Sequence, residues 1–257
     1  MRVFISTVPF AEFNTYPLDL LREANIDYSL NPYGRKLHEN ELGELIGESD
    51  YLIAGTEIIS QAVLRRATNL KLIARVGIGL DSVNLIRART QNVIVTYTPD
   101  GPSPAVAELT LGLMINLLRS IHLANAEIHN GEWKRYSGRR LSKCTIGIIG
   151  AGRIGVRVLE HLAGFHCHDI LVNDLQNSVE LGSYTNSRWA DKATIYKNAD
   201  VITLHVPLTE VTRGMISYKE LSLMKPGAVL VNTSRGGIVD ESALYDVMKD
   251  GHLSGAA

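Results

Sequence analysis

The stretch TIGIIGAGRIGVR, which begins at residue 145, places three glycines after an apolar run at spacings of two and three. The run 145–149 is typical of a buried strand, and the amphipathic segment 153–163 is typical of a helix. Glycines at such a junction form the dinucleotide-binding fingerprint. One makes the tight turn, one lets a pyrophosphate approach the backbone, and one lets the helix pack closely on the strand; here they are Gly150, Gly152 and Gly155. The pattern predicts a parallel α/β domain with phosphates at the helix N-terminus.

Asp174 follows the next apolar run, 169–173, and lies 19 residues after Gly155. A carboxylate there accepts hydrogen bonds from the hydroxyls of an adenosine ribose and repels a 2′-phosphate. No arginine stands in the following residues 175–178. The sequence therefore predicts NAD as the cofactor in preference to NADP. The alternative is an ordinary strand–helix turn whose glycines serve only the fold.

Short apolar runs alternate with amphipathic segments along the whole chain, which is typical of parallel strands joined by crossover helices. The residues 97–104 hold three of the eight prolines and predict a hinge. We therefore expect an α/β protein of two doubly wound parallel-sheet domains, over 1–100 and 101–257. A single long helix is expected over 105–130. The other expected strands are 2–6, 26–29, 51–54, 71–75, 93–96, 201–205, 228–232 and one beginning near 253, and the other expected helices are 41–46, 61–67 and 240–250.

Composition excludes several classes of function. The 257 residues carry a formal net charge of -1 and are 45% hydrophobic, without a basic patch, so no nucleic-acid partner is expected. The two cysteines, Cys144 and Cys167, are too few for a disulfide framework and favour a reducing compartment. The apolar segment 109–118 is too short for a membrane span. We expect a cytoplasmic protein with no membrane partner.

A second signature, MKPGAVLVNTSRGGIVD, occupies residues 224–240. Pro226 and Gly227 predict a turn before a buried strand, and Arg235 falls just past the carboxyl end of that strand. Ligands of open α/β sheets bind at this end. The glycines that follow Arg235 let the backbone turn and leave the guanidinium available. The alternative is a surface arginine at a turn.

Together these motifs resemble those of the D-2-hydroxyacid dehydrogenases, and within that family the phosphoglycerate dehydrogenases. The resemblance covers the whole chain and implies a flavodoxin-like substrate domain, a Rossmann NAD-binding domain, and hydride transfer between nicotinamide and C2 of a small 2-hydroxy or 2-oxo acid. It also implies a homodimer formed through the NAD-binding domain and, for phosphoglycerate, a place in serine biosynthesis. The motifs that carry it are RVGIGLD at 75–81, AVAEL at 105–109, the glycine fingerprint, HVP at 205–207 with Thr212, and NTSRGG at 232–237.

The resemblance also assigns site residues. Arg235 is expected to bind the substrate carboxylate and polarise its C2 oxygen, which suits the two parallel donors of a guanidinium. The backbone of a glycine loop is expected to contact the same carboxylate through Val76, Gly77, Ile78 and Gly79, although Gly77 and Gly79 could be simple loop glycines. The expected cofactor contacts are Ile78, Gly150, Gly152, Arg153, Ile154, Gly155, Asp174, Val206, Pro207, Thr212, Thr233, Ser234 and Arg235.

The sequence departs from the family in two places. Many phosphoglycerate dehydrogenases carry an arginine in the turn after the third strand, where this chain reads Ala-Gly-Thr at 54–56. Arg35 or Arg75 could take the anionic end of the substrate instead, or be solvated charges. In addition, the family's catalytic histidine and its partner glutamate lie beyond the equivalent of Ala257. The NAD-binding domain is therefore expected to lack its C-terminal end, and the chain as given is expected to be inactive.

No other histidine is expected to replace the missing base. His205 is expected to pack in a cofactor loop, and His161, His166 and His168 are expected at the surface or packed on a strand, so no metal site is predicted. The competing hypothesis is a dinucleotide-binding regulator, since the C-terminal-binding-protein corepressors resemble the same family.

Overall fold

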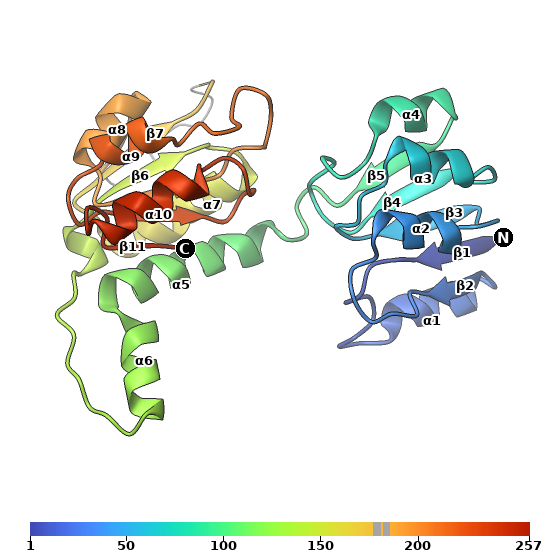
Figure 1. Cartoon of the computed structure of the whole chain (residues 1–257), viewed down its shortest axis with the longest axis horizontal. Coiled ribbons are helices and arrows are strands. Elements are labelled where there is room, and N and C mark those ends of the chain that lie inside the picture. Colours follow the sequence, from blue (N-terminus) through green and yellow to red (C-terminus); the bar gives the residue numbers. More distant parts are fainter. Residues whose placement is uncertain (177–180, 182–185) are drawn as a thin grey trace. The chain divides into compact units, whose positions relative to one another are not determined.

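The computed structural model describes residues 1–176, 181 and 186–257. The chain divides into two compact units, Met1–Pro102 and Ser103–Ala257 (Figure 1). Both units are parallel α/β structures, which confirms the expected fold class.

The first unit is a five-stranded parallel sheet in the order β2-β1-β3-β4-β5. This is the flavodoxin-like order, in which strands are added on one side of β1 and then on the other, so that the switch point lies between β1 and β3. The strands are β1 (Arg2–Ile5), β2 (Asp27–Leu30), β3 (Tyr51–Ala54), β4 (Leu72–Arg75) and β5 (Ile94–Tyr97), and the helices are α1 (Tyr16–Glu23), α2 (Glu39–Leu45), α3 (Gln61–Arg66) and α4 (Leu85–Thr90).

Alternate residues of the first sheet point into its main core. Leu52 and Ala54 of β3 and Ile73 of β4 are completely buried, and they belong to the same cluster as Val63 and Leu64 of α3. The short apolar runs that predicted these strands are thus more deeply buried at every second residue, as expected for strands with one face on the core. This core holds the carboxyl ends of β3 and β4 side by side.

In the second unit the described residues form a six-stranded parallel sheet in the order β11-β10-β9-β6-β7-β8. Numbered within the unit, this is the Rossmann order 6-5-4-1-2-3. The strands are β6 (Thr145–Ile149), β7 (Asp169–Asn173), β8 (Ser187–Trp189), β9 (Val201–Leu204), β10 (Val229–Asn232) and β11 (Gly255–Ala256). The helices are α5 (Ser103–Arg119), α6 (Ile121–His129), α7 (Arg153–Ala163), α8 (Lys192–Asn198), α9 (Tyr218–Leu223) and α10 (Glu241–Lys249), with a short 3-10 helix at Leu141–Lys143.

The single long helix expected over 105–130 is wrong. Ser120 has left-handed backbone angles, φ 52 and ψ 38, and the chain bends by 69° there between α5 and α6. The side-chain oxygen of Asn116 accepts the N–H of His122 at 2.9 Å, so a local side chain replaces a helical carbonyl at the break. Within the described ranges no single helix is long and apolar enough to span a bilayer, and α5 and α6 meet that test only when taken together across the bend.

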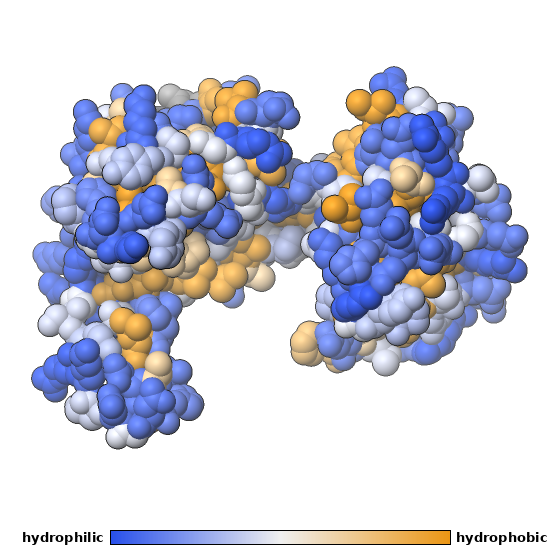
Figure 2. All heavy atoms as spheres, in the orientation of Figure 1, coloured by the Kyte–Doolittle hydropathy of each residue, from blue (hydrophilic) through white to orange (hydrophobic). Residues whose placement is uncertain are grey.

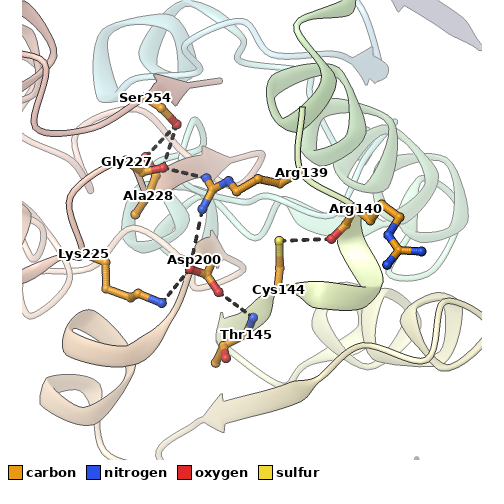
Figure 3. A network of polar contacts seen from close by, with 9 residues as sticks. All are labelled: Arg139, Arg140, Cys144, Thr145, Asp200, Lys225, Gly227, Ala228 and Ser254. Carbon is orange, nitrogen blue, oxygen red and sulfur yellow. Dashed lines mark hydrogen bonds and ion pairs between the residues drawn. The ribbon is translucent and has the colours of Figure 1, made fainter. Parts of the chain in front are cut away.

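A polar network joins the amino-terminal ends of three neighbouring strands of the second sheet (Figure 3). The carboxylate of Asp200, just before β9, accepts the N–H of Thr145 at 2.8 Å and the ammonium of Lys225 at 2.6 Å. Arg139 lies 3.5 Å from the same carboxylate and donates to the carbonyl of Gly227, before β10, at 2.6 Å. These side chains satisfy backbone groups at one edge of the sheet, opposite to the carboxyl edge where the glycine fingerprint lies.

Candidate functional site

The glycine turn follows β6 and leads into α7. Gly150 has φ +102, and its N–H donates to the carbonyl of Asn173 at 2.8 Å. A side chain at Gly150 would clash with the carbonyl oxygen of His205, and a Cβ at Gly155 would overlap the carbonyl oxygen of Gly150. Only glycine can occupy these two positions without a shift of the backbone. The helix is thereby brought directly against the turn.

Gly152 is the cap residue of α7, and no side chain caps the helix there. Apart from Gly152 and its two chain neighbours, no described residue has an atom within 4 Å of the position that a Cβ of Gly152 would take, so the surface is open at this point. The first N–H groups of a helix have no partner within the helix and attract anions. A pyrophosphate fits this open, uncapped helix start. Arg153 and Ile154 form the first turn of α7, where Arg153 is exposed.

Asp174 stands at the carboxyl end of β7. One of its carboxylate oxygens accepts the N–H of Ala151, within the glycine turn, at 2.6 Å, and the other accepts the N–H of Leu175 at 2.6 Å. The structure therefore joins two motifs that are 23 residues apart in the sequence. Of the residues 175–178 that lack an arginine, 177 and 178 lie outside the described residues.

The loop after β9 lies against the same turn. A methyl group of Val206 is 3.0 Å from the position that a Cβ of Gly150 would take. Farther along the loop, the hydroxyl of Thr212 donates to the carbonyl of Pro207 at 2.6 Å and accepts the N–H of Thr209 at 2.8 Å. The threonine thus closes a short turn that holds Pro207 near the end of the strand.

His205 is an uncharged side chain within this loop. Its Nε2 lies 3.0 Å from the hydroxyl of Thr203, while its buried Nδ1 has no partner among the described residues. Burial lowers the pKa of His205 to about 4, because the protein interior disfavours the charged imidazolium. At neutral pH the side chain is therefore neutral and packed inside the unit.

A third loop, after β10, carries Arg235. The side-chain oxygen of Asn232 accepts the N–H and the hydroxyl of Ser234 at 3.1 and 2.7 Å, and its amide donates to the carbonyl of Arg235 at 2.8 Å. The guanidinium of Arg235 donates to the carbonyl of Ser234 at 2.8 Å. The hydroxyl of Thr233 lies 2.8 Å from that of Thr110 on α5. This loop is held by its own side chains.

Sequence analysis missed Asn232 and Thr110 as supports of this loop. For Asn232 a signal was present, because an asparagine at the end of a strand commonly bonds to backbone groups two or three residues onward. Thr110 gave none, since it contacts Thr233 across 123 positions of sequence.

The first unit contains the glycine loop that follows β4. Arg75 is only 6% exposed and donates to the carbonyl of Gly79 at 2.8 and 3.0 Å and to the carbonyl of Ala54 at 3.3 Å. Gly77 has φ +144, and its N–H donates to the hydroxyl of Thr98 at 2.9 Å. On either side of Gly77, the loop contains Val76, which is half exposed, and Ile78, which is partly buried.

Of the two alternatives left open for Arg75, the solvated charge is wrong. A buried guanidinium requires acceptors for its donors, and here carbonyl oxygens of two loops supply them. Arg75 joins the turn after β3 to the loop after β4.

Arg35 pairs with a carboxylate of its own unit. Its two terminal nitrogens lie 2.9 and 2.6 Å from the carboxylate oxygens of Glu41. This pair and the N–H of His38 lower the pKa of Glu41 to about 2. Both partners are at the surface, and the charge of Arg35 is balanced locally.

The histidines near α7 and β7 do not form a ligand cluster. His161, His166 and His168 are all exposed. Across the part of the chain that the structure describes, no group of three or more His, Cys, Asp or Glu side chains is arranged to hold a metal ion.

Within the second unit the structure thus brings together the glycine turn, Asp174 and the loop after β9 at the carboxyl edge of one sheet. The loop with Arg235 follows β10, which is the neighbour of β9. The residues Val76–Gly79 lie at the carboxyl edge of the other sheet, in the first unit.

Comparison with known proteins identifies a family that shares these motifs. Residues 111–257 match the family model described as D-isomer specific 2-hydroxyacid dehydrogenase, NAD binding domain. The chain is 39% identical over 226 residues to D-3-phosphoglycerate dehydrogenase from Methanocaldococcus jannaschii, covering 86% of this chain and 43% of that protein. It is 36% identical over 223 residues to hydroxypyruvate reductase from Thermotoga maritima, covering 86% of this chain and 72% of that protein.

A solved structure of the same fold is D-lactate dehydrogenase from Aquifex aeolicus, complexed with NAD and lactic acid. It is 29% identical to this chain, with a TM-score of 0.81, and the match covers 100% of this chain and 75% of that one. The 257 residues therefore span less than half of the first relative and about three quarters of the solved structure.

Proposed function

Because the chain belongs to the D-isomer specific 2-hydroxyacid dehydrogenases and its cofactor is NAD, we propose that it serves hydride transfer between NAD and C2 of a small D-2-hydroxy acid. The observation that carries this proposal is the hydrogen bond from Ala151 to Asp174, which holds a carboxylate beside the open start of α7. A dinucleotide needs both features at once, a helix start for its pyrophosphate and an acceptor for its ribose.

Different residues of the second unit would bind different parts of the cofactor. Gly152, Arg153 and Ile154 would hold the pyrophosphate, and Asp174 would accept the ribose hydroxyls. The nicotinamide end would be flanked by Val206, Pro207, Thr212, Thr233 and Ser234. The family resemblance also assigns a cofactor contact to Ile78 of the first unit. When bound, NAD supplies C4 of its nicotinamide ring as the donor or acceptor of the hydride.

Two groups of residues would hold the substrate carboxylate. Arg235 offers two parallel N–H donors, which match the geometry of a carboxylate and polarise the neighbouring C2 oxygen. In the loop Val76–Gly79, the N–H groups of Val76 and Gly77 already donate to Ala54 and Thr98, so those of Ile78 and Gly79 would supply further donors. Arg75 keeps that loop in place through the carbonyl of Gly79. Asn232 does the same for the Arg235 loop.

The substrate class is a small 2-hydroxy or 2-oxo acid, and acids of three carbons are the candidates we favour. One relative is a dehydrogenase of phosphoglycerate and another is a reductase of hydroxypyruvate, and both act on such acids. Phosphoglycerate-type specificity and a place in serine biosynthesis are one form of this proposal.

We expect the full-length gene product to oxidise NADH when a small 2-oxo acid is added. The measurement is the loss of NADH absorbance with hydroxypyruvate, 3-phosphohydroxypyruvate, pyruvate and glyoxylate in separate reactions. NADH binding without oxidation by any of them would favour a dinucleotide-binding regulator over an enzyme.

Asp174→Ala should reduce the preference for NAD over NADP by about 1–3 kcal/mol, the contribution of one hydrogen bond to a charged group. Asp174→Asn keeps an acceptor for the N–H of Ala151 and should show the same loss of preference, because it removes the charge that opposes a 2′-phosphate. Dissociation constants for both cofactors, taken from quenching of protein fluorescence, measure the effect.

The matched control for this experiment is Asp169→Ala. Asp169 begins the same strand and pairs with Arg188 at the surface, 2.9 Å away. Its removal should leave the preference for NAD unchanged. If the wild-type protein binds NADP as tightly as NAD, the role assigned to Asp174 is wrong.

We also propose that the second unit forms a homodimer. Several large apolar side chains of α5 and α6 are exposed, namely Leu109 by 56%, Ile121 by 49%, Leu123 by 44% and Ile128 by 53%. Figure 2 shows hydrophobic residues gathered over these two helices. No residue of α6 is buried in the described structure, and a second copy packed on this surface would cover its apolar side chains.

A further inference from the structure

Buried polar side chains gather at the carboxyl edge of the first unit's sheet. Ser6 and Thr7 follow β1, Glu57 lies in the turn after β3, and Arg75 ends β4. Their exposures are 0, 7, 2 and 6%, so all four are almost fully enclosed. The strands β1, β3 and β4 are neighbours in that order. Polar groups buried at the carboxyl edge of an open parallel sheet lie where such sheets bind ligands.

The carboxylate of Glu57 lies where the residues that follow β1 and β3 come together. One oxygen accepts the N–H of Gly55 at 2.7 Å. The other oxygen and the hydroxyl of Thr7 lie 3.2 and 2.5 Å from the position that a Cβ of Gly55 would take. All residues of the first unit are described, and none of its ion pairs includes Glu57. The turn after β3 therefore carries a buried carboxylate that no cation pairs with.

The two nearby arginines already have acceptors. Arg75 donates to the carbonyls of Ala54 and Gly79, and Arg35 pairs with Glu41. Lys36, in the loop after β2, is an exposed lysine on this side of the sheet. A substrate with a second anionic group, in addition to its carboxylate, would thus bring that group near the carboxylate of Glu57 and near two arginines that already have acceptors.

We propose that Glu57 is a specificity-determining residue, which makes this edge accept small D-2-hydroxy acids whose distal group is an uncharged hydrogen-bond donor and reject those with a distal phosphate. The inference rests on the proposed function, because it assumes that the site takes a D-2-hydroxy acid. A carboxylate only accepts hydrogen bonds, which suits a hydroxyl. It repels a phosphate at short range, and such repulsion is a common source of specificity.

The test measures binding without hydride transfer. D-glycerate and D-3-phosphoglycerate are both reduced acids, so neither reacts with a protein saturated with NADH. Titration calorimetry on the full-length, NADH-saturated protein gives both dissociation constants. We expect D-glycerate to bind at least tenfold more tightly than D-3-phosphoglycerate.

Glu57→Gln should reduce this preference about tenfold, mainly through tighter binding of D-3-phosphoglycerate, since the amide keeps an acceptor for Gly55 and loses the charge. The control variant Lys36→Ala should leave the preference unchanged. A thermal unfolding curve shows whether each variant is folded.

The possible results distinguish a failure of this inference from a failure of the proposed function. Equal or tighter binding of D-3-phosphoglycerate by the wild-type protein overturns the inference without any variant and leaves the proposed function standing. The same holds if a folded Glu57→Gln keeps the full preference, or if Lys36→Ala removes the binding of D-3-phosphoglycerate. If NADH binds but neither acid does, the proposed function fails, and this inference fails with it.

Discussion

Gly155→Ala should destabilise the second unit by about 3 kcal/mol or more and abolish tight NADH binding. The added Cβ would overlap the carbonyl oxygen of Gly150, which is backbone and not the movable end of a side chain. Relief requires either α7 to move away from β6 or the turn at Gly150 to change, and overpacking in such a site costs about 1–3 kcal/mol or more. Urea unfolding and an NADH titration measure the two effects.

The matched control is Gly164→Ala, at the other end of the same helix. Gly164 has helical backbone angles, and the nearest atom to an added Cβ is the carbonyl oxygen of His161 at 3.7 Å, an ordinary contact. This variant should be as stable as the wild type or slightly more stable, because alanine restricts the unfolded chain. Equal stability of the two variants would show that α7 does not depend on close packing against the turn.

The glycine turn could be predicted because the spacing of its glycines follows from the geometry of a strand, a tight turn and a helix packed closely together. Gly155 is required by the carbonyl oxygen of Gly150, five residues earlier, and Gly150 has a φ of +102, so the local sequence carries most of the signal. The contact of Gly150 with His205, in contrast, joins distant parts of the sequence. The strands β3, β6 and β7 begin and end as expected for a similar reason, since their burial follows the apolar run.

Several short elements were not predicted, namely α1, α4, α8, α9 and β8, although α8 and α9 carried start signals. The helix α8 follows Asp191, whose side chain accepts the N–H of Thr194 at 2.6 Å, and α9 begins with the capping box of Ser217 and Glu220. Both patterns are visible in the sequence. Helices of six or seven residues present few turns, so their hydrophobic period is weak and their caps become an important local signal.

Arg75 shows what the sequence could not supply. An arginine at the end of a strand is equally compatible with a ligand site, a solvated surface and a buried support. Its role was decided by the carbonyls of Ala54 and Gly79, which belong to two different loops. Only the tertiary structure brings these acceptors to one guanidinium. The same reason applies to Asp174, whose bond to Ala151 joins two strands.

Arg235→Lys should weaken the binding of D-glycerate to the NADH-saturated protein by about 10- to 100-fold and leave NADH binding unchanged. An ammonium cannot donate two parallel hydrogen bonds to a carboxylate, and each hydrogen bond to a charged group contributes about 1.5–3 kcal/mol. In the full-length gene product kcat/KM for the 2-oxo acid that is reduced should fall by about 10²–10³, as expected when a donor to a developing negative charge is lost.

Arg213→Lys is the matched control for this experiment. Arg213 is exposed in the loop after β9, and one of its terminal nitrogens lies 3.5 Å from the position that a Cβ of Gly237 would take. It is thus an arginine next to the same NTSRGG motif without an assigned role, and its replacement should change neither constant. Asn232 offers a further comparison, because its amide donates to the carbonyl of Arg235 and fixes the loop through the backbone. Unchanged binding of D-glycerate by Arg235→Lys would remove this arginine from the substrate site, and the search for the carboxylate partner would move to the backbone of Val76–Gly79.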